Sequence, residues 1–417
     1  MSVAGIPLES ILVLPITIFA FLVLLTIIVF IHEYGHFSVA RILGVRVDVF
    51  SIGFGKPLLR WTDKKGTEWR IAALPLGGYV KFFGDLNAAS QAPTEAAQPV
   101  TTQFPKPGHE EEIAQGMTAE ERAVCFHFKP VWVRALVVAA GPVANFILAV
   151  AIFASLFMAF GRQYSEPVVG SVVSPSAAQE AGVMPGDRIV VVNGRSIQKF
   201  RQIQDAVMLS GGDEMAFLVL RSGQEVELTI QPTRAETTDR YGNSIEVWRL
   251  GIGGDPNAIG SEKYGFFGAI GAGTQELWRV LSVTTRFLGK LILGKEDAKQ
   301  LGGPIKMAQY AGQSVMSGFD ASSYAEPPGF MLMLKVSMLE FIQLAAFVSV
   351  SIGFLNLLPV PVLDGGHLLY YGYEAVVGKP LGPRAQAIGF RVGIAMLASL
   401  MIFVTWNDIN NLLSSFS

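Results

Sequence analysis

The sequence contains a single cysteine, Cys125, among its 417 residues, and this scarcity limits the chemistry it can perform. An internal disulfide is excluded, and so is a zinc site built from several thiolates. Any tightly bound metal ion must therefore take its ligands from histidine, aspartate and glutamate.

Charge is scarce as well. Only 16% of the residues are charged, 51% are hydrophobic, and the formal net charge is -2. This composition is typical of a membrane protein. Because the chain has no net positive charge with which to attract phosphates, no nucleic-acid partner is expected.

Four apolar runs reach the length of about 20 residues that the hydrocarbon core of a bilayer requires. They lie near residues 11–31, 131–160, 331–358 and 385–404. The first run has no basic residue before it and no clear small-residue cleavage site after it, so we expect it to remain as a transmembrane helix. The sequence predicts a polytopic α-helical membrane protein with about four transmembrane helices.

The distribution of basic residues predicts the orientation, because lysine and arginine near helix ends stay on the cytoplasmic side. The segments before residue 11 and after Trp406 contain neither. The connection between the first two runs contains many: Arg41, Arg46, Lys56, Arg60, Lys64, Lys65, Arg70 and Lys81. We therefore expect both termini, and the long connection 161–328, to be extracytoplasmic.

The sequence His32-Glu33-Tyr34-Gly35-His36 directly follows the first apolar run. Two histidines four residues apart share one face of a helix and can bind the same zinc ion, with the glutamate as general base. An ionisable residue in a membrane segment costs about 3 kcal/mol on insertion scales, so three of them together indicate a functional site rather than a polar helix end. The pattern predicts a zinc hydrolase site inside the membrane or at its rim, toward the cytoplasmic side.

Catalytic zinc sites typically use three protein ligands and a water, so one ligand must come from elsewhere. At the end of the third run, Pro359 and Pro361 must break the helix and allow a turn in which Asp364 can point inward. We expect Asp364 to be the third ligand. The alternatives are His367 as the ligand, and a purely structural role for Asp364 in the turn.

Residues 45–83 are rich in β-forming residues and glycine, and they predict membrane-associated β-hairpins. An unpaired strand edge beside a protease site can hold an extended substrate by strand addition. Gly77, Gly78 and Tyr79 are therefore candidate substrate-handling residues.

Two further segments have no predicted catalytic role. Residues 87–115 are predicted to be disordered, and His109 and His127 are expected to be surface residues rather than ligands. Residues 264–293 mix apolar and charged side chains and predict one or two amphipathic helices on the outer membrane surface. These helices would act as a gate, as a brace, or simply as a packed connector.

Residues 165–234 predict a soluble module made of short β-branched runs, turns and one helix. The expected helix and last two strands are residues 200–209, 215–221 and 225–230. The pattern resembles a PDZ domain, a fold that binds extended peptides at an open sheet edge, and an unrelated small β-rich domain is the alternative. We expect one extracytoplasmic PDZ-like α/β domain.

The predicted organisation follows the chain in seven segments. They are a first transmembrane helix (1–40), a cytoplasmic β-hairpin region with a disordered loop (41–129), a second transmembrane helix (130–161), the PDZ-like domain (165–234), an extracytoplasmic connector with amphipathic helices (235–328), a third transmembrane segment (329–367) and a fourth transmembrane helix (383–408).

Three features together resemble the site-2 protease family of intramembrane zinc metalloproteases, and most closely its bacterial regulator-of-sigma-E branch. They are His32-Glu33-x-x-His36, Asn356-x-x-Pro359-x-x-x-Leu363-Asp364-Gly365 and the PDZ-like module between them. The resemblance covers nearly the whole chain and extends to Gly141-Pro142-x-x-Asn145 and Leu301-Gly-Gly-Pro-Ile305.

The resemblance implies that His32, His36 and Asp364 bind zinc, that Glu33 is catalytic, and that Asn356 and Pro359 handle the substrate. It implies regulated intramembrane proteolysis in a bacterial inner membrane, as in the sigma-E stress response. The implied substrates are single-span membrane proteins such as anti-sigma factors already trimmed by another protease. The best-known bacterial member has two tandem PDZ domains, whereas one is found here, which weakens any size-filter role that depends on a pair.

Two other classes of function are open to the sequence. One is a catalytically idle membrane scaffold whose PDZ-like domain binds peptide ends and whose zinc is structural. The presence of Glu33, which a structural zinc does not need, argues against it. The other, a zinc transporter, is disfavoured because one ligand cluster and four spans show no internal repeat.

Overall fold

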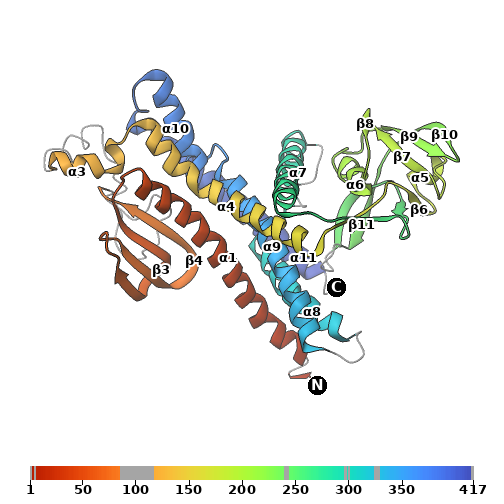
Figure 1. The fold of residues 1–417 in the computed structure, drawn as a ribbon, viewed down its shortest axis with the longest axis horizontal. Coiled ribbons are helices and arrows are strands. Elements are labelled where there is room, and N and C mark those ends of the chain that lie inside the picture. Colours follow the sequence, from red (N-terminus) through yellow and green to blue (C-terminus); the bar gives the residue numbers. More distant parts are fainter. Residues whose placement is uncertain are drawn as a thin grey trace. The chain divides into compact units, whose positions relative to one another are not determined.

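The computed structural model describes residues 2–3, 6–84, 117–238, 244–294, 298, 301–323 and 329–414 (Figure 1). The predicted disordered segment and His109 lie outside these residues. The chain divides into two compact units, which we describe separately. Unit 1 comprises Met1–Ala149 and Pro304–Thr405, and unit 2 comprises Val150–Gly303 and Trp406–Ser417.

Within the described residues, four helices are long and apolar enough to cross a membrane, which confirms that prediction. They are α1 (Leu8–Ile42), α4 (Val131–Phe160), α9 (Phe330–Asn356) and α11 (Pro383–Ser414). A helix satisfies its backbone polar groups internally, as a bilayer core demands. Large apolar side chains such as Phe19 and Ile402 are 70% and 73% exposed, which suits helices that face lipid.

The helix α8 (Pro304–Ser323) packs against α1 and α9 in unit 1. These residues fall within the predicted extracytoplasmic connector 235–328, and α8 is less apolar than the four long helices. Small residues explain its position: a Cβ on Gly312 would lie 2.1 Å from Thr17 Oγ1, and one on Gly318 would lie 2.0 Å from the Met333 carbonyl oxygen. Close backbone approach at these glycines and the packing of Met307, Tyr310 and Val315 on the apolar cluster formed mainly by α1 and α9 together hold α8 in place.

The strands β3 (Val47–Thr62) and β4 (Glu68–Phe82) form an antiparallel pair beside α1 (Figure 1). Phe50 lies opposite both Val80 and Trp69. The first half of β3 is therefore central in the sheet and pairs with the end of β4 on one side and with its beginning on the other. Gly53 and Gly55 have φ of 86° and 89°, which suits the bend within β3. As a result, residues 57–62 and 78–82 form the two edges of the sheet.

Asp63, in the turn between these strands, ties the sheet to α1. Its carboxylate accepts hydrogen bonds from Arg41 Nη1 at 2.5 Å, from the amides of Lys65 and Thr67, and from Trp69 Nε1. Burial acts to raise the pKa of Asp63, but these hydrogen bonds outweigh it and lower the pKa from 3.8 to about 2. The carboxylate therefore stays ionised at neutral pH, and the sheet is anchored beside the end of α1.

Short elements complete unit 1. They are β1 (Ser2–Val3), β2 (Ile6–Pro7), α3 (Ala119–Val124), the 3-10 turn η1 (Phe126–Phe128) and α10 (Asp364–Val377). Cys125 is buried and His127 is exposed, and among the described residues neither lies in a cluster of potential metal ligands.

Unit 2 contains a four-stranded antiparallel sheet in the order β10-β9-β7-β8 and three two-stranded pairs, β13-β6, β14-β5 and β11-β12. Its elements are β5 (Arg162–Ser165), β6 (Val169–Val172), α5 (Ala177–Glu180), β7 (Arg188–Val192), β8 (Arg195–Ser196), α6 (Phe200–Met208), β9 (Met215–Arg221), β10 (Gln224–Ile230), β11 (Thr233–Thr238), β12 (Ser244–Arg249), β13 (Ile252–Gly254), β14 (Ile259–Glu262) and α7 (Phe266–Ile292). The expected helix 200–209 and strands 215–221 and 225–230 coincide with α6, β9 and β10.

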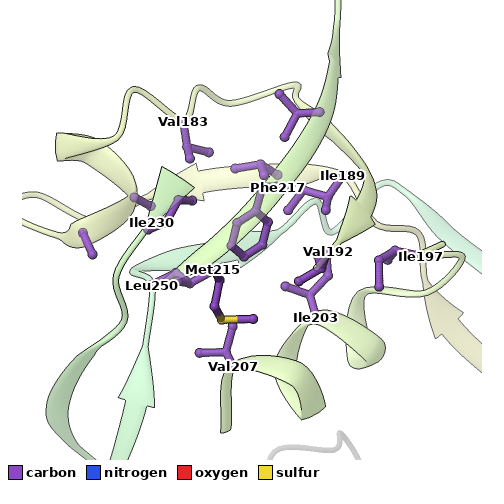
Figure 2. Packing of buried hydrophobic residues seen from close by; sticks show 14 of the residues in the cluster. Val183, Ile189, Val192, Ile197, Ile203, Val207, Met215, Phe217, Ile230 and Leu250 are labelled. Atoms are coloured by element: carbon purple, nitrogen blue, oxygen red, sulfur yellow. The ribbon is translucent and has the colours of Figure 1, made fainter. Parts of the chain in front are cut away.

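The core of unit 2 forms where the inward face of β9 meets α6 (Figure 2). Met215 and Phe217 alternate with exposed or half-buried residues along β9, and Met215 lies beside Val207 of α6. The core also includes Leu250, and β13 pairs with β6. The folded module therefore extends beyond residue 234, because later strands return to pair with its first strands.

A buried carboxylate connects α7 to the rest of unit 2. Glu276 is 2% exposed and lies 2.7 Å from Arg162 Nη2 and 2.8 Å from Arg279 Nη2, and Arg279 also binds Asp205 of α6. Burial acts to raise the pKa of Glu276, but the guanidinium groups hold it below its usual range. The segment for which the sequence predicted one or two amphipathic helices forms the single helix α7, and these ion pairs connect it to β5 and α6.

Candidate active site

The helix α1 places His32 and His36 on one face, one turn apart. Their Nε2 atoms are 3.2 Å from each other, and His32, Glu33 and His36 are all buried. Three buried ionisable residues within one helical turn of an apolar helix are costly to keep, so an interaction must compensate for their burial.

Asp364 joins the two histidines from the other end of the chain. Its Oδ2 atom lies 3.1 Å from His32 Nε2 and 3.5 Å from His36 Nε2. The chain leaves α9 after Asn356, and Asp364 is the first residue of α10, so it lies in a helical first turn rather than in the open turn that the sequence predicted.

Two glycines allow this tight return of the chain. A Cβ on Gly365 would lie 2.3 Å from the carbonyl oxygen of Leu357, and one on Gly366 would lie 2.3 Å from that of Val360. Any other residue type would push α10 away from the preceding turn. The Asp-Gly-Gly sequence is thus required to bring the carboxylate to the histidines.

The three side chains fit a zinc ion. Zinc with nitrogen and oxygen ligands at 2.0–2.2 Å in tetrahedral geometry has its ligand atoms about 3.4 Å apart, and the separations here are 3.1, 3.2 and 3.5 Å. Asp364 Oδ2 is buried and accepts no hydrogen bond from the described residues. A buried carboxylate oxygen that converges with two imidazole nitrogens and lacks a donor is best satisfied by a cation.

His367, the alternative ligand, does not belong to this cluster. It lies one turn further along α10, and its ring is near that of Tyr370, with 6.3 Å between the ring centroids. Among the described residues, the group that can hold a metal ion consists of His32, His36 and Asp364.

The helix α4 forms a wall directly against the two imidazoles. A Cβ on Gly141 would lie 2.2 Å from His36 Nε2 and 2.8 Å from His32 Nε2, so only glycine leaves room for both rings. His36 Nδ1 lies 2.8 Å from the Val137 carbonyl oxygen. A carbonyl can only accept, so Nδ1 carries the proton and Nε2 keeps its lone pair for a metal.

Sequence reasoning missed these contributions of α4. In the sequence, Gly141 and Asn145 stand out only through the family resemblance, and no sequence pattern points to the Val137 backbone carbonyl. The sole signal was the spacing of Gly141 and Asn145, four residues apart on one helix face.

Of the candidate substrate-handling residues, Gly78 lies closest to Glu33. A Cβ on Gly78 would be 3.1 Å from Glu33 Cγ and 2.8 Å from the Ser51 carbonyl oxygen. Gly77 and Tyr79 instead approach the Phe54 ring, Gly77 in a conformation with φ of 155°. An edge segment of β4 therefore lies directly against Glu33.

Asn356 and Pro359 lie at the exit from α9. Asn356 is its last residue and is half-buried, and Pro359 is exposed in the turn that follows.

Comparison with known proteins agrees with this geometry. The family model for peptidase family M50 matches residues 20–400. A protein of Agrobacterium fabrum, provisionally named a zinc metalloprotease, is 43% identical over 94% of this chain and 95% of its own length. The metalloprotease MmpA of Caulobacter vibrioides is 41% identical over 95% of this chain and 96% of its own.

A more distant relative covers the same extent. A Rickettsia conorii protein, also provisionally named a zinc metalloprotease, is 33% identical over 96% of this chain and the whole of its own length. The resemblance to the site-2 protease family is thereby confirmed. This chain belongs to peptidase family M50 and is a membrane-embedded zinc metalloprotease.

Proposed function

We propose that this metalloprotease cleaves peptide bonds within the transmembrane segments of single-span membrane proteins, such as anti-sigma factors already trimmed by another protease. The observation that carries the proposal is the location of the buried site. His32, Glu33 and His36 lie on an apolar helix long enough to span a bilayer, so the bond to be cut must come to a membrane-embedded centre. A catalytically idle scaffold has no use for a buried Glu33.

In this proposal His32, His36 and Asp364 hold the zinc ion. When bound there, zinc lowers the pKa of a water toward about 7 and polarises the scissile carbonyl. Glu33 accepts the proton of that water and later delivers it to the leaving amine. Gly141 keeps α4 close against the imidazoles and so excludes bulk water from that side.

The substrate must be extended before it is cut, because the peptide bonds of a helix are already hydrogen-bonded. The edge of the sheet at residues 78–82 offers backbone groups for strand addition, and Gly78 lies against Glu33. A substrate paired with this edge would have a peptide bond held next to the catalytic carboxylate. Asn356 and Pro359 are proposed to contact the substrate at the exit from α9.

We also propose a bacterial inner-membrane location with the active site toward the cytoplasm and both termini outside. The basic residues that follow α1 support this orientation. The sheet β10-β9-β7-β8 with α6 is proposed to be a PDZ-like domain on the outer side that binds peptide ends. Its two-layer architecture supports this assignment.

The substitution Gly78→Ala is expected to lower the rate of proteolysis by about 10- to 100-fold and to leave bound zinc unchanged. The added methyl group would meet the Ser51 carbonyl oxygen and Glu33, and would displace the edge strand from the carboxylate. Cleavage assays and zinc analysis of the purified protein test this. Gly382→Ala, at a position with open space, is the matched control. Full activity of Gly78→Ala would remove the edge strand from the mechanism.

The helical stability of a substrate's transmembrane segment can be varied to test the proposed substrate class. Leucine in place of weak helix formers in a substrate's transmembrane segment is expected to slow cleavage, because the helix must unwind locally. The same replacements outside the segment serve as the control. Equal cleavage of stiff and flexible segments would contradict the proposal that the enzyme cuts unwound transmembrane helices.

A further inference from the structure

Asn145 of α4 lies behind the metal cluster, on the far side of the His32 ring. It is completely buried, and its Nδ2 atom is placed 3.2 Å from His32 Nδ1. Its Oδ1 atom is also buried and has no hydrogen-bond partner among the described residues. A buried amide oxygen without a donor is rare and costly.

The protonation of a metal-binding imidazole determines which end of the amide can face it. If Nε2 of His32 binds zinc, the neutral ring carries its proton on Nδ1, which is then a donor. An NH2 group facing that nitrogen would place two donors against each other. Rotating the carboxamide by half a turn exchanges Oδ1 and Nδ2 in nearly the same space and gives the donor an acceptor.

We propose that Asn145 Oδ1 accepts the Nδ1 proton of His32 and that Asn145 is a positioning residue for zinc binding. It fixes the ring orientation of His32 and the tautomer with its lone pair on Nε2. The proposal rests on the ligand set proposed above. It assigns a role to the Gly141-Pro142-x-x-Asn145 sequence, in which Gly141 makes room for the rings and Asn145 orients one of them.

The surroundings of Asn145 are built to hold it in place. Ser349 of α9, itself fully buried, donates its hydroxyl hydrogen to the backbone carbonyl oxygen of Asn145 at 2.9 Å. A Cβ on Gly353, one turn later, would lie 3.1 Å from the Pro142 carbonyl oxygen, so α9 and α4 are in close contact here. His36 has an equivalent acceptor in the Val137 carbonyl oxygen. Both imidazoles are thus held from behind by α4.

The zinc affinity of variants of the full-length protein tests this role. Competition with a chelator is expected to show that Asn145→Leu, which has no acceptor, weakens zinc binding by about 10- to 100-fold. Asn145→Asp keeps an acceptor and lacks a donor, so its affinity is expected to stay within a few-fold of the wild type. A loss in Asn145→Asp equal to that in Asn145→Leu would show that the amide acts as donor, and would overturn the proposal.

A second readout separates positioning from general stabilisation. NMR of ¹⁵N-histidine-labelled, zinc-loaded protein reports, through the chemical shifts of the His32 Nδ1–H group, whether its proton is hydrogen-bonded. The shifts of a hydrogen-bonded proton are expected in the wild type and in Asn145→Asp but not in Asn145→Leu. The control Asn407→Leu removes another buried asparagine, one that donates to the Leu301 carbonyl oxygen. Its zinc affinity should not change.

The variant His32→Ala tests the proposed zinc ligands separately from the positioning role of Asn145. If His32→Ala binds zinc as tightly as the wild type, the proposed ligand set is wrong. If His32→Ala loses zinc while Asn145→Leu retains wild-type affinity, the ligand set stands and only the positioning role fails.

Discussion

Glu33→Gln should reduce proteolysis by about 10²- to 10⁴-fold while zinc stays bound. The glutamine amide has nearly the same shape as the carboxylate but cannot accept a proton from the attacking water. Zinc should remain because Glu33 is outside the cluster of His32, His36 and Asp364. Cleavage of tagged single-span substrates and metal analysis of the same preparations measure both effects.

Two other outcomes for Glu33→Gln would each contradict a different part of this prediction. Cleavage that survives in Glu33→Gln would remove Glu33 from the mechanism. Loss of zinc together with activity would show that the carboxylate supports the metal centre itself. Tyr34→Phe is the matched control, because Tyr34 is the neighbouring residue, its side chain is exposed and its ring stacks on Phe30.

Addition of one methyl group to α4, at Gly141, is expected to cause a large loss of zinc binding and proteolysis. Gly141→Ala should weaken zinc binding and proteolysis by about 100-fold. The new Cβ would lie 2.2 Å from His36 Nε2 and 2.8 Å from His32 Nε2, both far inside van der Waals contact. Either the rings rotate away from the metal or α4 moves away from α1. Chelator competition and a cleavage assay measure the loss.

A matched glycine in the same unit provides the control for Gly141→Ala. Gly372 lies within the helix α10, and a Cβ there would meet open space. Gly372→Ala should therefore behave as the wild type. Wild-type zinc affinity in Gly141→Ala would mean that the imidazoles do not occupy the positions described here.

The spanning helices could be predicted because a bilayer forces each helix to be apolar along its whole length. The two histidines could be predicted because their spacing is local to one helix turn. The helix α8 could not be placed with the spans, because part of its packing is close approach at Gly312 and Gly318, and small residues give no hydropathy signal. Packing by close approach becomes visible only in three dimensions.

Long-range contacts explain the remaining differences. The rule that catalytic zinc takes three protein ligands led to Asp364, but the sequence alone left His367 open. The return of the chain through Gly365 and Gly366 brings Asp364 to the histidines, and His367 lies one turn beyond. No local pattern indicates that Asn145 lies behind His32, or that β13 pairs with β6 to enlarge the soluble module. These contacts depend on which helices and strands pack together, and the sequence of a short segment does not predict that.

If His32, His36 and Asp364 bind the zinc ion as proposed, their order along the chain imposes a delay during biosynthesis. His32 and His36 leave the ribosome early, whereas Asp364 follows only after the strands β5 to β14 and the helices α7, α8 and α9 have been made. A nascent chain therefore carries Glu33 without a complete metal centre. The protease cannot acquire activity until α9 and α10 have been synthesised, so an interrupted or truncated product is inert toward its neighbours in the membrane.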